Sequence, residues 1–496
     1  MLHRAHFTHF HSGGRAAGTT TAKVEASKDF VADIPSPKQI YADNAIPGEE
    51  AEIAISRKQR GFRLAVVHRV VSPSQDRVTP FCPHAELCGG CNWQHIAYPA
   101  QLHWKREILI NALKKYDIKT PFVPEPIPSP LLQRYRNKSE YAFSDDETPC
   151  FGFHPKEDPA KVFPCQTCFL QPPHVHATAQ KVFHIAQEMK IMMVKTLQIR
   201  TTTTGGTFCI LGFCINDPPT AAPDPILPFL TRLQQTIPQI SGWFYSITDL
   251  SDTARPFYPN YIHFAGATHL EEVIDDTHFT YSPQSFFQPN PLQAAALYRY
   301  IADHAQLTGT ETLYDLYTGA GTIACFLAPR AKQVIGIEGN PIAIGDARIN
   351  AALNNLHNTQ FITGDILETF TPSFIDSHPK PNLIILDPPR SGTLIEIKKA
   401  IRYAAPEKII YVSCNPVSLA WDLKQLYGDD ATYCHASEPH DNSSREPRGS
   451  SISEPYANGE PRGSNISYRV TALQPFDMFP HTHHVESVCV LEKFTI

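Results

Sequence analysis

The sequence predicts an α/β protein whose C-terminal part is a doubly wound parallel sheet, preceded by a small β-rich unit and a mixed central domain. From about residue 281 onward, apolar strand-like runs alternate with helix-like stretches, which is typical of a parallel sheet covered by helices. Nearer the N-terminus, alternating apolar positions at 52–55 and 63–71 predict β-strands instead. Because 496 residues exceed what one core usually holds, we expect several domains. The expected domains are 1–70, 71–280 and 281–496.

The C-terminal region is expected to begin with a helix at 292–307 and a strand at 312–317. Further strands are expected at Gln333–Glu338, Thr359–Thr363, Leu383–Leu386 and Lys408–Ser413. Residues 436–467 interrupt this alternation with a Ser-, Pro- and Gly-rich segment that contains the near-repeat EPRGSSIS and EPRGSNIS. Its low hydrophobicity predicts a disordered surface insertion.

The central region shows fewer regular patterns, with strand-like runs at 140–143 and 207–214 and a helical period at 100–115. The net charge of −6 does not by itself indicate a nucleic-acid-binding protein. Residues 56–138, however, contain 14 Lys and Arg against 5 Asp and Glu. Such a basic segment either binds phosphates or forms an ordinary solvated surface.

Membrane insertion and export are not predicted. No apolar run reaches the ~18 residues that a spanning helix needs, and the N-terminus MLHRAHFTHFHSGG lacks the apolar stretch of a secretory signal. We therefore expect a cytoplasmic protein, in which the 12 cysteines are thiols or metal ligands and not a disulfide framework.

A nucleoside site is predicted at three consecutive strand ends. The turn with Gly319 and Gly321 lets the backbone approach a ligand closely. Glu338 ends the next strand, where an acid can accept hydrogen bonds from ribose hydroxyls. Asp365 follows the third strand, where a carboxylate can bond an adenine amino group. This pattern fits an adenosyl ligand, and by itself it leaves both NAD and S-adenosylmethionine open.

Reactive groups are predicted at two further strand ends. Asp387 follows an apolar strand in NLIILDPPRSG, and Cys414 follows another in IIYVSCNP. A thiol at the carboxyl edge of a parallel sheet is a candidate nucleophile. A thiolate added to C6 of uracil would make C5 electron-rich enough to take a methyl group, and a base must then remove the C5 proton. The segment DMFPHTHHVESVCVLEK offers Glu486 for that role, together with His481, His483 and His484.

Four motifs, LYDLYTGAGT, LDPPRSG, VSCNP and DMFPHTHHVES, occur in this order and resemble those of the RNA (uracil-5-)methyltransferase family. The preceding SPQSFFQPN resembles that family's glutamine motif. The resemblance implies a Rossmann-like methyltransferase domain, with Cys414 as nucleophile and Glu486 as base. It also implies an S-adenosylmethionine pocket lined by Gln288, Tyr317, Thr322, Glu338, Asp365 and Asp387. The segment AIPGEEAEIAI resembles part of a degenerate TRAM-type OB barrel, which implies an RNA-binding domain at 1–70.

A second group of cysteines lies in CPHAELCGGCNWQH. From spacing alone, Cys88 and Cys91 could pair with Cys165 and Cys168 in a zinc site. Alternatively, Cys82 with Cys88, Cys91 and one later cysteine could hold a [4Fe-4S] cluster. The resemblance to the ribosomal branch of the family implies the [4Fe-4S] cluster, with a structural role. Its ligands would be Cys82, Cys88, Cys91 and Cys168, while Cys165 departs from the family pattern.

The resemblance thus implies a monomeric enzyme that methylates C5 of a uridine in 23S ribosomal RNA. The stretch RYRNKSEY, which mixes cations with tyrosines, is typical of a surface that contacts structured RNA. The alternatives are a transfer-RNA uracil-C5 methyltransferase, a cytosine-C5 methyltransferase and a non-catalytic iron-sulfur RNA-binding protein. The presence of Cys414, Glu486 and the cofactor acids argues against the last of these.

Overall fold

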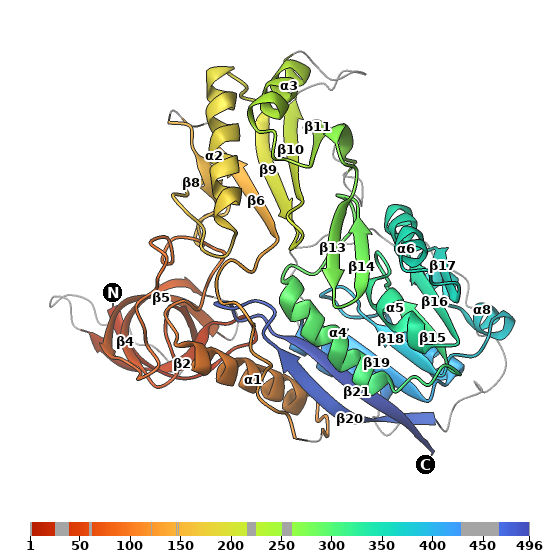
Figure 1. The fold of residues 1–496 in the computed structure, drawn as a ribbon. Helices are drawn as coiled ribbons and strands as arrows, with labels where there is room; N and C mark the ends of the chain where they lie inside the picture. Colours follow the sequence, from red (N-terminus) through yellow and green to blue (C-terminus); the bar gives the residue numbers. More distant parts are fainter. Residues whose placement is uncertain are drawn as a thin grey trace.

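A computed structural model describes most of the chain (Figure 1). The described residues are 2–24, 39–58, 62–120, 122–144, 146, 148–215, 225–249, 260–427 and 466–495. Of the predicted insertion, residues 436–465 lie outside this set. The expectation was wrong for Ile466 and Ser467, which begin strand β20, because their main chain pairs with that of β21.

The N-terminal unit is a closed barrel with strand order β1-β2-β3-β5-β4. Its strands are β1 (Leu2–Phe10), β2 (Ala16–Val24), β3 (Gln39–Asp43), β4 (Glu50–Lys58) and β5 (Phe62–Ser72). From His3 to Phe7 every second residue of β1 is buried, and Ala5 and Phe7 belong to the barrel core. The sequence predicted only the last two strands, because histidine and threonine on the outer face of β1 conceal its period of two.

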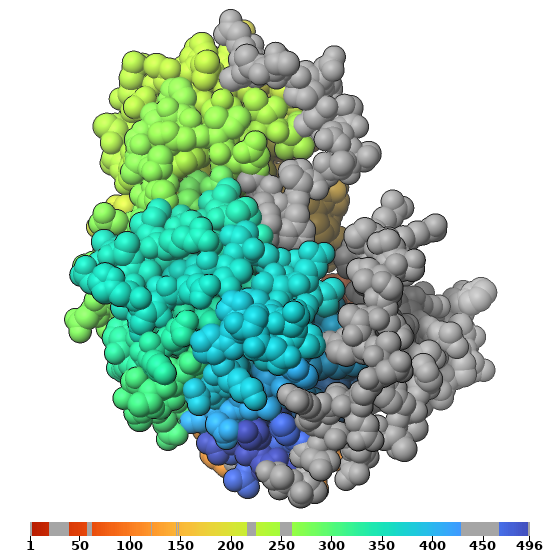
Figure 2. Space-filling model, turned by 90° about the vertical axis from the view of Figure 1, so that its right-hand side faces the viewer, coloured from red at the N-terminus to blue at the C-terminus, as the bar shows by residue number. Residues whose placement is uncertain are grey.

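The central region forms a second sheet, with strand order β12-β11-β10-β9-β6-β7-β8. All its pairs are antiparallel except β10 with β11. The strands are β6 (Lys138–Phe143), β7 (Phe151–Phe153), β8 (Phe163–Pro164), β9 (Val194–Thr201), β10 (Thr207–Ile215), β11 (Gly242–Asp249) and β12 (Ile262–Gly266). Helices α2 (Pro173–Glu188) and α3 (Ile226–Thr236) bury their apolar faces in one core with this sheet. Figure 2 shows this part of the chain, in yellow-green, standing above the teal and blue C-terminal part.

The C-terminal sheet has the order β17-β16-β15-β18-β19-β21-β20, parallel from β17 to β19 and antiparallel at the last two strands. Its strands are β15 (Thr312–Leu316), β16 (Gln333–Glu338), β17 (Thr359–Thr363), β18 (Leu383–Leu386), β19 (Lys408–Ser413), β20 (Ile466–Phe476) and β21 (Glu486–Thr495). A hairpin of β13 (Leu270–Ile274) and β14 (Thr277–Tyr281) precedes it. The predicted α/β fold class is confirmed, and so are the four strands predicted from Gln333 onward.

Helices cover both faces of this sheet, because the strands are apolar on both sides. Ile384 packs toward one face and Ile385 toward the other. Helices α4 (Pro291–Ala305), α5 (Thr322–Leu327) and α6 (Pro341–Leu353) lie on one side. The other side is covered by α9 (Ile395–Ala404), α10 (Pro416–Leu426) and α1 (Tyr98–Lys115), the last of which comes from the central region. The shorter helical elements are η1 (Ala328–Arg330), α7 (Ile366–Thr369) and α8 (Pro372–Ser377).

The loop 477–485 between β20 and β21 extends from the C-terminal sheet to the barrel, as the blue ribbon in Figure 1 shows. It contacts the barrel at Gly14 and the region after the cysteine motif at Trp93. The three regions are therefore joined at this loop. Among the described residues, no helix combines the length and the apolar character that crossing a bilayer requires.

Candidate active site

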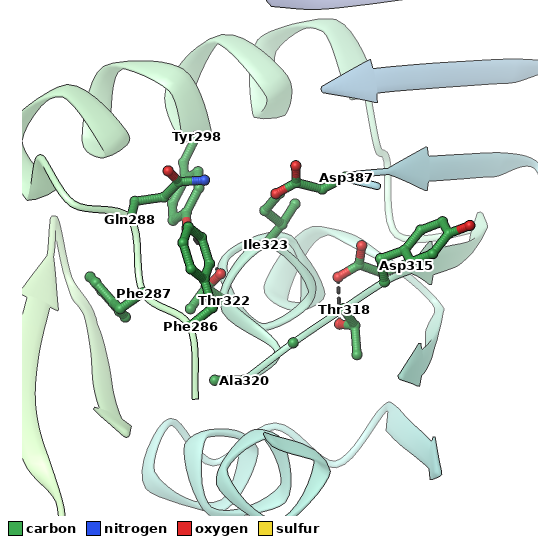
Figure 3. A pocket seen from close by; sticks show the side chains of 12 residues that line it. Phe286, Phe287, Gln288, Tyr298, Asp315, Thr318, Ala320, Thr322, Ile323 and Asp387 are labelled. Atoms are coloured by element: carbon green, nitrogen blue, oxygen red, sulfur yellow. Dashed lines mark hydrogen bonds between the residues drawn. The ribbon is translucent and has the colours of Figure 1, made fainter. Parts of the chain in front are cut away.

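A partly open pocket lies at the carboxyl ends of β15 and β18, where the strand order of the sheet reverses. Its walls come from the SPQSFFQPN segment, the Gly-rich turn, α4 and the end of β18. Figure 3 shows Gln288, Asp315 and Asp387 pointing into this space from three different segments. Of the six residues predicted to bind the cofactor, Gln288, Tyr317, Thr322 and Asp387 line the pocket.

The other two predicted acids lie outside the pocket lining. Glu338 accepts a hydrogen bond from the Gly319 N–H (3.2 Å) and so supports the turn that forms one wall. Asp365 is exposed and caps α7 by accepting from the Leu367 N–H (2.8 Å). The cap satisfies one otherwise unpaired amide of that helix. Neither residue is brought into the same cavity as Gln288 and Asp387.

The Gly-rich turn holds a strained backbone against the pocket. Tyr317 has φ of 64°, a left-handed conformation that non-glycine residues rarely adopt. Its hydroxyl and that of Thr393 share a hydrogen bond (2.8 Å), which ties the turn to the loop after β18. Gly321 has φ of 72°, and a Cβ there would overlap Ala347 of α6. The turn therefore needs glycine at this position, as the sequence indicated.

Asp315 is a pocket residue that the sequence did not predict. It is buried in β15, where its Oδ2 accepts a hydrogen bond from the Thr318 hydroxyl (2.6 Å). Its Oδ1 makes no hydrogen bond within the described residues. Burial raises the pKa of Asp315 to about 7. An acid within the apolar run LYDLY was the available signal, because a buried carboxylate is costly unless a ligand or partner compensates it.

Asp387 lies beside Asp315 on the neighbouring strand's end. Burial and the Asp315 carboxylate raise the pKa of Asp387 to about 7. Two facing carboxylates attract a cation, and the methyl donor S-adenosylmethionine carries a sulfonium and an ammonium group. NAD carries a diphosphate, which these acids would repel. The two acidic side chains of the pocket therefore fit S-adenosylmethionine better than NAD.

Cys414 directly follows β19, and Glu486 is the first residue of β21; because these two strands pair, the two side chains lie close together. Burial and the Glu486 carboxylate raise the pKa of Cys414 to about 11, and the Arg390 guanidinium opposes that rise. Burial and Asp387 raise the pKa of Glu486 well above its usual value. Cys414 is half-buried, and Glu486 is 4% exposed. The predicted nucleophile and the predicted base thus share one water-poor site with Asp387.

Arg390 is the second functional candidate that the sequence did not predict. Its main-chain oxygen accepts a hydrogen bond from the Asn415 side chain (3.0 Å), and Asn415 also caps α10. Its guanidinium donates to Nδ1 of His484 (2.6 Å). Arg390 therefore places a positive charge near Cys414, which favours the thiolate over the thiol.

The three histidines of the 477–485 loop are structural in this geometry. Burial lowers the pKa of His481 and His483 to about 4 and that of His484 to about 3. All three are therefore neutral at pH 7. His481 bonds to Gln101 of α1, His483 to Asn92 and His484 to Arg390. Glu486 is therefore the better candidate for the base.

The predicted metal-binding cysteines come from two loops that lie against each other. Cys91 packs with Cys168 beside Tyr135 and Leu170. Burial raises the pKa of Cys91 to about 12, and the other cysteines add to the rise. A bound cation would relieve this repulsion between thiolates, which is the chemistry of a metal site. As they stand in the described part of the chain, no three His, Cys, Asp or Glu side chains converge closely enough to hold a metal ion.

Comparison with known proteins places the chain among enzymes. Residues 268–432 match the family described as tRNA (uracil-5-)-methyltransferase. A protein of Bacteroides thetaiotaomicron named uncharacterized RNA methyltransferase is 33% identical over 91% of this chain and 96% of its own. One of the same name from Porphyromonas gingivalis is 34% identical over 92% and 96%.

A solved structure shares the fold along almost the whole chain. The Pyrococcus abyssi tRNA (uracil-54, C5)-methyltransferase, in complex with S-adenosyl-L-homocysteine, has a TM-score of 0.68 and 23% identity. The match covers 98% of this chain and 100% of that one. The relatives that match over almost their full length, together with the matched family model, identify the chain as a member of the RNA (uracil-5-)methyltransferase family.

Proposed function

We propose that this protein uses S-adenosylmethionine to methylate C5 of a uridine in ribosomal RNA, through a covalent bond between Cys414 and C6 of the base. The observation that carries the proposal is the position of Asp387. It lines the cofactor pocket, and it also raises the pKa of both Cys414 and Glu486. A methyl donor held in this pocket would therefore lie beside the reactive pair, as a direct transfer requires.

Cys414, Arg390 and Glu486 have different roles in the proposed reaction. S-adenosylmethionine supplies an electrophilic methyl group on a cationic sulfonium. The Cys414 thiolate, favoured by Arg390, adds to C6 of uracil and moves electron density onto C5, which takes the methyl group. Glu486 then accepts the C5 proton, the C5–C6 double bond re-forms, and Cys414 leaves as a thiolate. The pyrimidine returns to its aromatic form with one methyl group more and one proton fewer.

The substrate must present its uracil outside a stacked helix, because a thiol cannot reach C6 within one. The RYRNKSEY stretch supports RNA contact near this site, since Lys138 lies near both Arg136 and Arg200 and the three form a group of positive charges. The side chain of Asn137 also donates to the main-chain oxygen of Gln288 (3.0 Å). The barrel at 1–70 and the central region at 71–280 would hold the RNA while residues 281–496 carry out the transfer.

Transfer RNA is the second candidate substrate. It is favoured by the fold shared with the P. abyssi enzyme, whose name specifies uracil 54 of transfer RNA. Ribosomal RNA, of the 23S type, is favoured by the cysteine group, which resembles that of the ribosomal branch. Both RNA classes belong in every assay of this protein.

We also propose that Cys82, Cys88, Cys91 and Cys168 hold a [4Fe-4S] cluster that orders the central region, with zinc as the alternative. Cys168 is preferred to Cys165 as the fourth ligand. The Cys165 thiol donates to the Thr167 oxygen (3.2 Å) within its own loop, whereas Cys168 packs against Cys91. The transfer itself needs no electron carrier, so the cluster's contribution is structural.

The deciding experiment uses ribosomal- and transfer-RNA fragments that contain 5-fluorouridine, incubated with S-adenosylmethionine and anaerobically purified protein. Fluorine cannot be removed as a proton, so a protein–RNA adduct is expected on denaturing gels. Cys414→Ala is expected to form none while still binding S-adenosylmethionine. If wild-type protein that binds S-adenosylmethionine forms no adduct with either RNA class, the proposed chemistry is wrong.

A further inference from the structure

The loop 477–485, which leads directly into Glu486, is anchored by residues that lie far away in the sequence. Lys105 of α1 bonds to the Asp477 carboxylate (2.5 Å) and to the Phe479 oxygen (3.0 Å). Gln101, also in α1, accepts from the His481 N–H (2.9 Å). The orientation of the base therefore depends on the region that follows the cysteine motif.

Asn92, the residue after Cys91, contacts the same loop at His483, three residues before the base. Its Oδ1 accepts from the His483 N–H (3.2 Å), and its Nδ2 lies 2.6 Å from His483 Nδ1. Because Oδ1 must face the N–H, Nδ2 must donate to the ring nitrogen. Burial keeps His483 neutral, which leaves Nδ1 free to accept. One amide thus fixes both the main chain and the ring of His483.

The space around His483 allows little movement. A Cβ on Gly14 of the barrel would overlap the His483 side chain, and Gly14 has φ of 76°. The Gly14 oxygen accepts from the Trp93 indole (2.9 Å), and the Trp93 N–H donates to the His481 oxygen (3.0 Å). The barrel and the cysteine region therefore both pack against the 477–485 loop at His483. A displacement of Asn92 cannot be absorbed on the barrel side.

We propose that Asn92 is a positioning residue for the base: its two bonds to His483 set the 477–485 loop so that Glu486 meets the C5 proton. This inference rests on the proposed function, because it assigns Asn92 to the elimination step of that reaction. The bonds between Asn92 and His483 also assign the cysteine region a function, which is to position the base. Cys91 and Asn92 are consecutive residues. A change in the conformation of the cysteine group would therefore move Asn92 and, through its bonds to His483, the loop that positions the base.

The nucleophile is held by other contacts. Asn415, directly after Cys414, caps α10 through the Val417 N–H (3.0 Å). It also donates to the Arg390 oxygen, as described above, and among the described residues its side chain makes no hydrogen bond to the 477–485 loop. Loss of Asn92 should therefore slow proton removal and leave addition and methyl transfer largely intact.

The test is Asn92→Ala with RNA that contains ordinary uridine. A displaced base should leave the methylated adduct waiting for elimination, so protein–RNA adduct should accumulate on denaturing gels. Its release should be about 10- to 100-fold slower than in wild type, the range expected when a general base is misplaced and not removed. The affinity for S-adenosylmethionine should stay unchanged. Asn92→Asp, which keeps the acceptor for the His483 N–H, should restore part of the release rate.

The matched control is Asn358→Ala. Asn358 also donates to two main-chain oxygens, those of Ala328 and Ala331, but it lies at the far side of the sheet from this loop. Samples are compared at equal iron content, because Asn92 adjoins Cys91. If Asn92→Ala accumulates no more uridine adduct than Asn358→Ala, the assignment is overturned.

Two further results separate this inference from the proposed function. Should Asn92→Ala fail to fold, His483→Ala removes the same Nδ1 bond from the other side, and it should accumulate adduct in the same way. Wild-type protein that forms the 5-fluorouridine adduct while both variants release ordinary RNA at the wild-type rate would leave the function standing and refute the role of Asn92. Absence of the 5-fluorouridine adduct in wild type would instead refute the function itself.

Discussion

Asp315 raises the pKa of Asp387 from the end of the neighbouring strand, and burial acts in the same direction on both carboxyl groups. Each group has a pKa of about 7, so a change of pH near neutrality alters the charge of the cofactor pocket. The affinity of the pocket for a cation must change with it.

The first prediction concerns that pH dependence. Below about pH 7 the two acids are protonated and neutral, and above it they are anionic, so binding of S-adenosylmethionine should tighten about tenfold as pH rises from about 6 to about 8. S-adenosylhomocysteine lacks the sulfonium charge and should show a shallower dependence. Titration calorimetry with both ligands measures the difference. Asp315→Asn should flatten the profile, and equal slopes for the two ligands would rule out this electrostatic role.

The second prediction is that Glu486→Gln separates addition from elimination. The amide keeps the shape of the side chain but cannot accept the C5 proton, so turnover should fall by about 10²- to 10⁴-fold. Adduct with ordinary uridine should accumulate, as gels will show, and Cys414→Ala should form none. Because burial holds the pKa of Glu486 well above its usual value, release by the wild type should become faster as pH rises. A release rate in Glu486→Gln equal to that of wild type would exclude Glu486 as the base.

The third prediction concerns the fully buried ion pair of Lys105 and Asp477, whose side chains are both 0% exposed. Lys105→Met leaves a buried carboxylate without its cation, which should lower the free energy of unfolding by about 3–5 kcal/mol. Urea denaturation followed by fluorescence measures this loss. Lys161→Met removes an exposed partner of Asp158 and should change stability by less than about 1 kcal/mol. Similar effects of the two substitutions would contradict a role for burial.

The fourth prediction distinguishes the two candidates for the fourth cysteine ligand. After anaerobic purification, Cys168→Ser should lose bound iron and the visible absorption of an iron-sulfur cluster. Cys165→Ser should keep both, because the Cys165 thiol bonds within its own loop. Iron and sulfide analysis with absorption spectra provides the measurement. The reverse pattern would make Cys165 the ligand, and zinc in place of iron in the wild type would favour the alternative metal.

The parts of the site that could be predicted are those encoded by local pattern. Cys414 and Asp387 were predicted because each follows an apolar strand, and parallel strands bring their carboxyl ends to one edge. Asp365 follows a strand in the same way, yet the structure uses it as a helix cap. Both outcomes begin from the same local sequence, an acid between a strand and a helix, and only tertiary geometry separates them.

The missed features depend on contacts between distant segments. Asp315 lies within a strand, where one acid among apolar residues does not break the strand pattern. Arg390 is a functional candidate partly because its side chain bonds to His484, and Asn92 because its side chain bonds to His483. Asn92 and His483 are hundreds of residues apart in the sequence. No periodic pattern in the sequence predicts a hydrogen bond between two such distant residues. The sequence showed three histidines in the same segment as Glu486, and in the structure burial lowers their pKa values so that they are neutral at pH 7.

The order of strands β19, β21 and β20 has a consequence for the growing polypeptide on the ribosome. The thiol of Cys414 is synthesised well before Glu486, so an interrupted chain would carry a nucleophile without its base and could attach itself to RNA permanently. In the finished sheet, however, β21 pairs directly with β19. A chain that stops before β21 leaves β19 as an open, apolar edge. The base therefore enters the site only when the last strand of the sheet has been made and has paired with β19.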